Sequence, residues 1–328
     1  EAIEHFHRGL AILADLQDSL DKTRQELACL LELGFALAVF KGFGSSQVHE
    51  VYTRAQVLTQ QLREPPNPAI LRALALFFVT RRQYAEAYTQ GREILALAYQ
   101  PNGQIDPVLF VEAHYVLGAT IFWTGDFLQA KDHFEKALTV YDTQRHNGLI
   151  SLYGQDPGVV CLIRLAYVLW YLGYPELAQQ KCEESLALAR RLDHPFSLSY
   201  VLIIAGLLYN VCRARTKIQI LVKEIMAHIQ KYEIQHWLPL GFILQGWSLV
   251  EQGAIEAGID QIRAGQEAFE RIQQDLFRPY ALALLAQAQA RAGSLDQALS
   301  TLDEALATVS HHGDGWCIAE LHRLKGEL

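Results

Sequence analysis

Residues 109–142, LFVEAHYVLGATIFWTGDFLQAKDHFEKALTVYD, contain the pattern that decides the fold of this chain. Two helix-length stretches flank a Gly125–Asp126 turn, and small residues recur at fixed distances from that glycine. Gly118 stands seven residues before it, and Ala130 and Ala137 stand five and twelve residues after it. Two antiparallel helices can approach to about 8 Å only where the facing side chains are small. The stretch therefore predicts a closely packed pair of helices joined by a short turn.

Prolines and glycines indicate that this pair is repeated along the chain. Proline in a first helical turn loses no hydrogen bond and presets φ, so each such proline predicts a helix start. The expected starts are Pro68, Pro107, Pro157, Pro195, Pro239 and Pro279, spaced by 39, 50, 38, 44 and 40 residues. A second marker about 18 residues later ends the first helix of each pair. It is Gly125, Gly173, Gly253 or Gly293, with Arg82 and Cys212 at the equivalent place in two weaker repeats.

Alignment on this second marker extends the small-residue pattern to the other repeats. The residues seven positions before it are Ala75, Gly118, Ala166, Ala205, Gly246 and Ala286. The pattern is weakest near 195–230, where Lys217 and Glu224 stand in place of small residues. It resembles the tetratricopeptide repeat, most specifically in 109–142, where Leu117 and Phe134 also match. The period is nearer 40 than 34 residues, which predicts longer helices or linkers than the standard repeat.

We therefore expect an all-α, tetratricopeptide-like, right-handed superhelix of about 16 helices, forming one domain over 1–328. Residues 1–18 read as a partial repeat, 21–311 as seven helix pairs, and 314–328 as the start of a truncated repeat. The first pair is expected to turn at Lys41–Ser46. Because both ends fall inside helical patterns, we expect the chain to be a segment of a longer polypeptide.

The composition excludes several classes of protein. Hydrophobic residues make up 51 % of the 328 residues, which is too many for a disordered chain. Acidic residues outnumber basic ones by 36 to 28, which argues against nucleic-acid and membrane partners. The apolar run from Phe196 to Cys212 is shorter than the ~20 residues a bilayer needs, so a buried helix is expected there. Five scattered cysteines predict small core residues in a reducing compartment, and hence a cytoplasmic location.

Several strings resemble one family more narrowly. They are Tyr153–Leu162 (YGQDPGVVCL), Arg145-His146, Gly173-Tyr174-Pro175, His194–Ser197 (HPFS), Arg278–Tyr280 (RPY) and Ala319–Leu328 (AELHRLKGEL). They are similar to the tetratricopeptide C-terminal region of large bacterial signalling ATPases, of the signal-transduction ATPase type, some of which carry a class III adenylate/guanylate cyclase. The resemblance implies an ATPase, and in some members a nucleotide cyclase, elsewhere in the same polypeptide.

The segment itself carries no sign of catalysis. A GxxxxGK[ST] phosphate loop is absent from the sequence, and no Ser/His/Asp or Cys/His arrangement stands out. His311-His312 with Asp314 lacks a third ligand and reads as a helix end at Gly313. We therefore expect no enzyme activity, no catalytic residue, no cofactor and no metal in this segment.

The concave wall of such a superhelix is lined by the first helix of each pair, and it is the main candidate for a binding surface. The residues expected there are Tyr115, Phe122, Trp123, Ile163, Tyr167, Trp170, Tyr171, Tyr209, Trp247 and Tyr280, with Ala119 and Gln287. Tyr and Trp offer a large contact area at low entropy cost, which suits recognition. Packing of these aromatic residues between adjacent helices is the alternative. Trp170 and Tyr171 are neighbours on a helix and cannot both point the same way.

The longest linker, from Asp142 to Pro157, holds a second set of candidates. These are Arg145, His146, Tyr153 and Asp156, with Gln155. Loops with distinctive polar residues can bind ligands. Asp156 before Pro157 is also an ordinary helix N-cap, so a ligand contact and a structural role both stay open.

These features predict a non-catalytic protein-interaction or sensing module of a larger signalling ATPase. It would bind a peptide, a partner protein or a small inducer on its concave face and regulate the parent's own ATPase or cyclase domain. The alternative is a structural oligomerisation scaffold, a homo-oligomer without a ligand.

Overall fold

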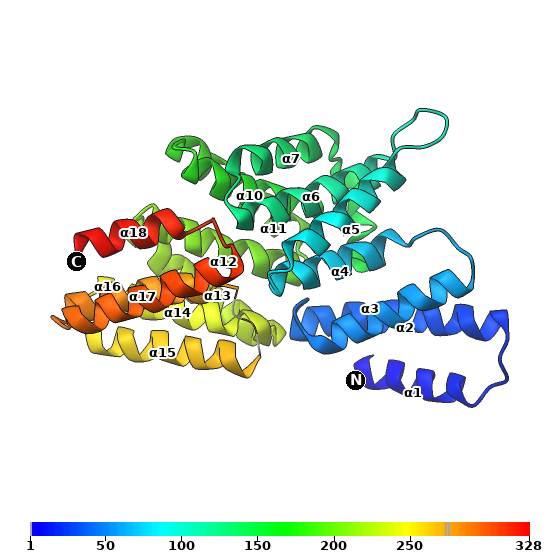
Figure 1. The fold of residues 1–328 in the computed structure, drawn as a ribbon, viewed down its shortest axis with the longest axis horizontal. Helices are drawn as coiled ribbons and strands as arrows, with labels where there is room; N and C mark the ends of the chain where they lie inside the picture. The colour runs from blue at the N-terminus through cyan, green and yellow to red at the C-terminus, as the bar shows by residue number, and fades with distance from the viewer. Residues whose placement is uncertain (1, 273, 275) are drawn as a thin grey trace.

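The computed structural model describes residues 2–272, 274 and 276–328, and these residues form a succession of antiparallel helices (Figure 1). The first half contains α1 (Ala2–Ala14), α2 (Leu20–Lys41), α3 (Ser46–Gln61), α4 (Pro68–Thr80), α5 (Tyr84–Ala98), α6 (Pro107–Thr124), α7 (Phe127–Val140), α8 (Thr143–Asn147) and α9 (Ile150–Tyr153). The second half contains α10 (Pro157–Tyr171), α11 (Pro175–Leu192), α12 (Pro195–Val211), α13 (Arg215–Tyr232), the 3-10 helix η1 (Gln235–Trp237), α14 (Leu238–Glu251), α15 (Ile255–Arg271), α16 (Arg278–Arg291), α17 (Leu295–His312) and α18 (Ile318–Glu327). The expected all-α superhelix is confirmed, and the short helices α8 and α9 in the long linker come in addition to the sixteen helices expected.

The prolines stand where the helices begin. Pro68, Pro107, Pro157 and Pro195 are the first residues of α4, α6, α10 and α12, and Pro239 and Pro279 lie in the first turns of α14 and α16. Side chains directly before four of them cap the new helix. Asp106, for example, accepts the backbone N–H groups of Val108 and Leu109. Each proline thus supplies the fixed φ and each cap satisfies an otherwise orphan donor.

The turns inside the pairs correct one expected position. Gly125, Gly173, Gly253 and Gly293 all have a positive φ, as does Arg82. In the repeat formed by α12 and α13 the positive φ belongs to Arg213, at 54°, whereas Cys212 is right-handed. The marker therefore lies one residue later than Cys212. This shift places Gly206, rather than Ala205, at the helix crossing.

With the marker at Arg213, Lys217 and Glu224 are no longer the residues of α13 that face α12. The equivalent positions are held by Ile218 and Ile225, which are 2 % and 1 % exposed. Gly206 makes room for them, because a Cβ there would lie 3.3 Å from Cδ1 of Ile225. This repeat therefore keeps the close crossing with the small residue on one helix only.

Elsewhere the small residues meet as expected. A Cβ on Gly118 would lie 2.9 Å from the ring of Phe134, and one on Gly258 would lie 2.6 Å from the carbonyl oxygen of Gly246. Ala137 and Ala178 are fully buried. At these positions the helices approach so closely that added volume would separate them.

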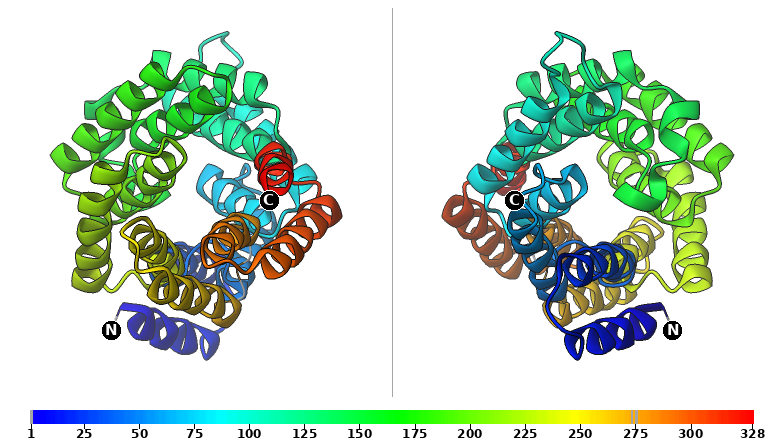
Figure 2. Two further views of the ribbon diagram at one scale, coloured as in Figure 1. Left: turned by 90° about the vertical axis from the view of Figure 1, so that its left-hand side faces the viewer. Right: turned by 90° about the vertical axis from the view of Figure 1, so that its right-hand side faces the viewer.

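The superhelix closes on itself. Seen end-on, the helices surround a central axis (Figure 2). The backbone N–H of Gly315 donates to the carbonyl oxygen of Trp123, over 2.9 Å, where the end of α6 meets the segment between α17 and α18. A second contact joins α2 to η1, since a Cβ on Gly42 would lie 3.2 Å from Cβ of His236.

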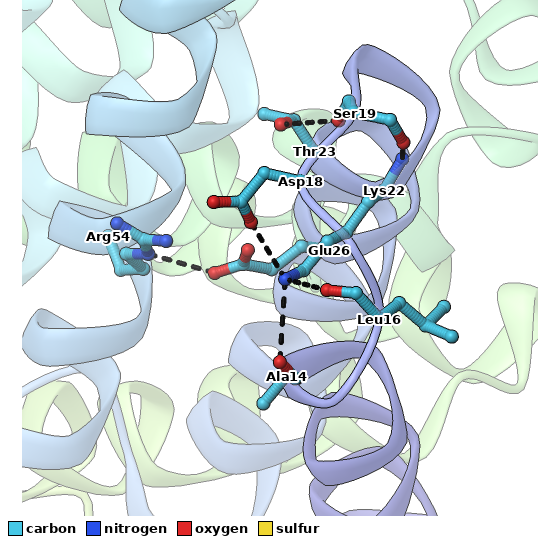
Figure 3. A network of polar contacts seen from close by, with 8 residues as sticks. All are labelled: Ala14, Leu16, Asp18, Ser19, Lys22, Thr23, Glu26 and Arg54. Carbon is cyan, nitrogen blue, oxygen red and sulfur yellow. Dashed lines mark hydrogen bonds and ion pairs between the residues drawn. The ribbon is translucent and has the colours of Figure 1, made fainter.

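The N-terminal helix α1 is attached by polar contacts (Figure 3). Nζ of Lys22 on α2 lies 3.5 Å from the carbonyl oxygen of Ala14, the last residue of α1, and donates to the carbonyl oxygen of Leu16 at 2.8 Å and to Asp18 at 2.9 Å. A cation near the last carbonyl groups of a helix is favourable. Nε of Arg54 on α3 donates to Glu26 on α2 at 2.8 Å, which links the next two helices. Ile3, Phe6 and Leu10 pack against the N-terminal part of the core.

The apolar helices and the cysteines lie in the interior. The run from Phe196 to Cys212 corresponds to α12, whose residues are mostly buried against other helices. Within the described residues, α6 alone is long and apolar enough to cross a bilayer, and 72 % of it is buried inside the protein. All five cysteines are free thiols, and Cys161, Cys182 and Cys317 are buried.

Candidate functional site

The superhelix holds a partly open cavity of about 90 Å³ in its interior. Its walls come from the turn after α2, from α4, α6, α10 and α12, from η1 with the start of α14, from α15, and from the residues before α16. The lining residues are Gly42, Phe43, Leu76, Val79, Thr80, Tyr115, Ala119, Trp123, Gln155, Arg164, Phe196, Tyr200, His236, Trp237, Leu240, Phe269, Gln274, Leu276 and Phe277. Segments far apart in the sequence thus meet at one apolar, aromatic chamber.

Arg164 is the one residue with a formal charge among the described residues that line this cavity. It is 6 % exposed, and its Nε donates to the hydroxyl of Tyr200. Its guanidinium carbon lies 5.1 Å from the ring centre of Trp123 and 5.4 Å from that of Phe122. Aromatic faces attract a cation but do not neutralise it. The cavity therefore has a net positive charge.

A second buried arginine nearby is neutralised. Nε of Arg72 on α4 lies 2.7 Å from a carboxylate oxygen of Glu112 on α6, and both side chains are buried. Arg72 also donates to the carbonyl oxygen of Tyr153 and lies 5.2 Å from the ring of Tyr115, behind the cavity wall. The contrast shows that Arg164 differs in having no carboxylate partner among the described residues.

Three ring nitrogens of the cavity walls have no hydrogen-bond partner among the described residues. They are Nε1 of Trp123, Nε1 of Trp237 and Nδ1 of His236. Burial lowers the pKa of His236 to about 3. A hydrogen bond with the backbone of Phe40 raises this pKa, but by less than burial lowers it. The imidazole is therefore neutral at pH 7. The three nitrogens are themselves fully buried, so they lie within the walls and are not open to the cavity.

A groove of about 480 Å³ lies next to the cavity. Phe269 and Gln274 line both spaces. The groove is otherwise lined by Arg81, Gln266, Glu270, Arg278, Leu282, Leu285, Thr301 and Glu304. Its volume is within the range of small-molecule sites, about 300–1,000 Å³. Gln274 and Phe269 therefore stand between a polar outer groove and an aromatic inner cavity.

Trp316 packs among aromatic residues expected on the concave wall. It is 1 % exposed and lies 5.2 Å from Trp123, 6.1 Å from Phe122 and 6.3 Å from Tyr280, ring centre to ring centre. Tyr167 lies 6.4 Å from it. The preceding Asp314 forms a buried ion pair with Arg82, Nη1 to Oδ2 at 2.9 Å, and accepts the hydroxyl proton of Tyr84.

The residues expected on the concave wall are thus divided among different surroundings. Tyr115, Trp123 and Ala119 line the cavity, whereas Phe122, Tyr167 and Tyr280 are buried around Trp316. Tyr171 is half-buried and stacks on Phe127 at 4.6 Å.

The remaining four lie away from the cavity walls. Ile163 is fully buried, and Trp170 packs half-buried against the core. The hydroxyl of Tyr209 donates a hydrogen bond to Glu183 at 2.6 Å. The ring of Trp247 lies 4.8 Å from the guanidinium of Arg291. The predicted wall residues therefore do not form one continuous open surface.

The linker residues also separate. Asp156 is buried, caps α10 through the backbone N–H of Val159 and accepts the hydroxyl of Tyr141 at 3.0 Å. His146 is buried, with Nδ1 2.7 Å from the carbonyl oxygen of Asp142, and Tyr153 is buried beside Arg72. Arg145 is exposed. Gln155 lines the cavity.

Sequence reasoning missed Arg164, Tyr200, His236 and Trp237. One signal was available, because Arg164 is the only charged residue in the α10 sequence PGVVCLIRLAYVLWY. A lone arginine in such a helix needs a special environment when it is buried. A search of the described residues for three or more His, Cys, Asp or Glu side chains able to hold a metal ion found none.

Comparison with known proteins gives the fold. No family model matches the chain. An uncharacterized protein of Rhizobium meliloti (strain 1021) is 18 % identical over 332 residues, covering 100 % of this chain but 32 % of its own length. The chain therefore spans about a third of the length of that relative.

Three solved structures share the superhelix. A Rap protein complexed with competence and sporulation factor aligns with a TM-score of 0.61 at 10 % identity, covering 99 % of this chain and 96 % of that one. NprR in complex with its cognate peptide NprX gives 0.58 at 12 %, covering 92 % and 81 %. A signal transduction ATPase with numerous domains and a tetratricopeptide repeat sensor, from Pyrococcus horikoshii, gives 0.56 at 14 %, covering 100 % and 53 %. At these identities the likeness shows a shared tetratricopeptide-like fold.

Proposed function

We propose that this chain is a non-catalytic sensing module that binds a small molecule or a peptide inside its closed superhelix. The observation that carries the proposal is the interior cavity lined by the buried Arg164, which has no carboxylate partner among the described residues. A buried charge without a counter-charge lowers the stability of the folded chain. Its presence at a cavity is best explained by a ligand that pairs with it.

The closure of the superhelix supplies a means of reporting that ligand. The cavity lies between elements from both halves of the chain, and contacts such as Gly315 to Trp123 hold these halves together. A ligand that touches both halves favours the closed form by its binding free energy. Binding would thereby change the shape that the module presents to a neighbouring domain.

In this proposal residues 1–328 act as one solenoid, with 1–18 as a partial repeat and 314–328 as the start of a truncated one. The neighbouring domain would be a signalling ATPase, in some relatives joined to a nucleotide cyclase, within a cytoplasmic protein. Two comparisons support this assignment. The Pyrococcus horikoshii ATPase carries its sensor in the same fold, and the Rhizobium meliloti relative is about three times longer than the chain. No cofactor and no nucleic-acid or membrane partner is assigned.

The direct test is ligand fishing with the intact chain. Fractions of small molecules and peptides extracted from the source cells are added, and thermal unfolding is followed. A ligand that binds only the folded state raises Tm. At a ligand concentration of a hundred times Kd, it adds about 2.7 kcal/mol to the free energy of unfolding. Stabilisation by a fraction, with the ligand then identified by mass spectrometry, supports the proposal. No stabilisation by any fraction would contradict it.

One observation favours the alternative of an oligomerisation scaffold. Ile12, Leu16 and Leu20, in and after α1, are 66 %, 50 % and 64 % exposed. Neighbouring apolar side chains of this kind can form an interface. Light scattering decides this alternative, because a strict monomer at high concentration would contradict it.

A further inference from the structure

We propose that the ligand is a small organic carboxylate, and that Arg164 binds its carboxylate group inside the cavity. This inference rests on the proposed function, that is, on the interior binding a ligand at all. It adds the chemical class of the ligand and the residue that selects it.

The charge of the cavity is the first argument. Burying an unpaired charge is costly, so buried arginines are normally paired with a carboxylate or a phosphate. Arg72 follows this rule through Glu112, 2.7 Å away. Arg164 does not, because among the described residues its guanidinium contacts the Tyr200 hydroxyl and the rings of Phe122, Trp123 and Tyr200. The missing counter-charge is supplied by an anionic ligand.

The geometry of Arg164 is the second argument. Its Nε is used by Tyr200, and the aromatic faces around the guanidinium cannot accept its remaining N–H groups in the plane. Those N–H groups form the planar fork that matches a carboxylate. The ring of Trp123 lies 5.1 Å from the guanidinium and also lines the cavity. Arg164 can thus bind an anionic group beside an aromatic wall.

Size restricts the ligand. One water molecule needs about 10–15 Å³ of cavity volume. The cavity of about 90 Å³ therefore admits a molecule of several non-hydrogen atoms and excludes a large one. The shared boundary at Phe269 and Gln274 leads to the groove of about 480 Å³, which gives a route of entry. A free organic acid and the C-terminal residue of a short peptide both offer the required group.

The test is calorimetric titration of the intact chain with paired probes. Acetate, lactate and benzoate are each compared with acetamide, lactamide and benzamide, and trialanine with its C-terminal amide. The same titrations are made with Arg164→Met and Arg164→Lys. The control is Arg291→Met, which removes an arginine that also lies over a tryptophan ring, 4.8 Å from Trp247, but outside the cavity.

We expect at least one free carboxylate to bind at least tenfold more tightly than its amide. Arg164→Met should weaken that binding at least tenfold, Arg164→Lys should weaken it less, and Arg291→Met should leave it unchanged. Preference for lactate identifies a free acid, and preference for trialanine identifies a peptide end. If Arg164→Met fails to fold, the carboxylate assignment is still tested by two comparisons. These are carboxylate against amide on the unmodified chain, and the unmodified chain against Arg164→Lys.

Two results would overturn the inference: no binding of any carboxylate, or equal binding by the chain and Arg164→Met. If extract fractions nevertheless stabilise the chain, the sensing function stands and only the carboxylate assignment fails. If no fraction and no carboxylate binds, both proposals fail.

Discussion

The backbone N–H of Gly315 donates to the carbonyl oxygen of Trp123 over 2.9 Å, and this bond joins the C-terminal part of the superhelix to the end of α6. The two flanking residues act at the same place. Asp314 pairs with Arg82, and Trp316 enters the aromatic interior beside Trp123. Three consecutive residues therefore close the superhelix over its concave wall.

Gly315→Ala is expected to weaken this closure. A Cβ at this position would lie 2.1 Å from the carbonyl oxygen of Thr124, and backbone cannot rotate away as a side chain can. The segment would have to move, at a cost of about 1–3 kcal/mol. Urea unfolding measures the loss, and a red shift of tryptophan emission reports exposure of Trp316. Gly326→Ala is the control, because a Cβ there meets nothing within 4 Å and alanine favours a helix. Equal stability of the two variants would contradict the closure.

Asp314→Asn tests the ion pair of the same segment. Asp314 and Arg82 are both buried, and Asp314→Asn removes the negative charge from their ion pair. Breaking a buried pair in this way typically costs about 3–5 kcal/mol. The control is Glu135→Gln, which breaks an exposed pair with Lys131 and should cost less than about 1 kcal/mol. Chemical denaturation of both variants makes the comparison, and a loss for Asp314→Asn as small as the control's would be against the prediction.

The helices could be predicted because local signals specify them. Pro107 and Asp106 together mark the start of α6, and Gly125 ends it, so a few residues with distinct backbone preferences set the boundaries. The weakest repeat was misaligned by one residue because Arg213 takes the left-handed conformation that glycine adopts elsewhere. An arginine gives no sequence signal for that conformation.

Exchange at this turn tests the corrected alignment. Arg213 has φ 54°, where a non-glycine residue pays a steric cost that glycine does not, whereas Cys212 is right-handed. Arg213→Gly is expected to stabilise the chain by about 0.5–1 kcal/mol, and Cys212→Gly to destabilise it by a similar amount. Thermal unfolding measures both. Stabilisation by Cys212→Gly instead would restore the original alignment.

Ala178→Leu and Ala137→Leu test the helix crossings. Both alanines are fully buried where neighbouring helices meet, so extra methyl groups would force the helices apart. We expect each variant to lose about 1–3 kcal/mol of unfolding free energy. Ala85→Leu on α5 is the matched control, because Ala85 is exposed and leucine is accepted on a helix surface. Unchanged stability in the buried variants would show that the repeat alignment is wrong.

The candidate site was less predictable than the helices. The sequence pattern shows which face of a helix is apolar, and Tyr115 and Trp123, which were expected on the concave wall, line the cavity. It does not show that the superhelix closes, because closure depends on small rotations accumulated over many repeats. His236, Gln274 and Arg164 come together only through that closure. Trp316 covers the concave wall for the same reason, and no local pattern near residue 316 marks it as an insertion.

Closure also creates a pH dependence to which the buried His236 contributes. Burial lowers the pKa of His236 to about 3, compared with about 6.5 for an exposed histidine. The unfolded chain therefore takes up a proton between these values that the folded chain refuses. As far as His236 is concerned, the free energy of unfolding is highest above pH 6.5 and decreases as the pH falls toward 3. Between pH 7 and pH 4.5 the loss from this group is on the order of 2 kcal/mol.

His236→Phe should remove that part of the pH dependence, whatever its effect on stability at pH 7. Other groups contribute in both directions, since burial lowers the pKa of His114 to about 4 and raises the pKa of the Asp156 and Glu112 carboxyls. These other groups are present in every variant, so their contributions cancel when the slopes of unfolding free energy against pH are compared. Unfolding free energies are measured from pH 7 to 4.5 for the chain, for His236→Phe and for His7→Gln, whose side chain is exposed. We expect a shallower decline for His236→Phe alone, and identical slopes in all three proteins would show that His236 is not held neutral in the interior.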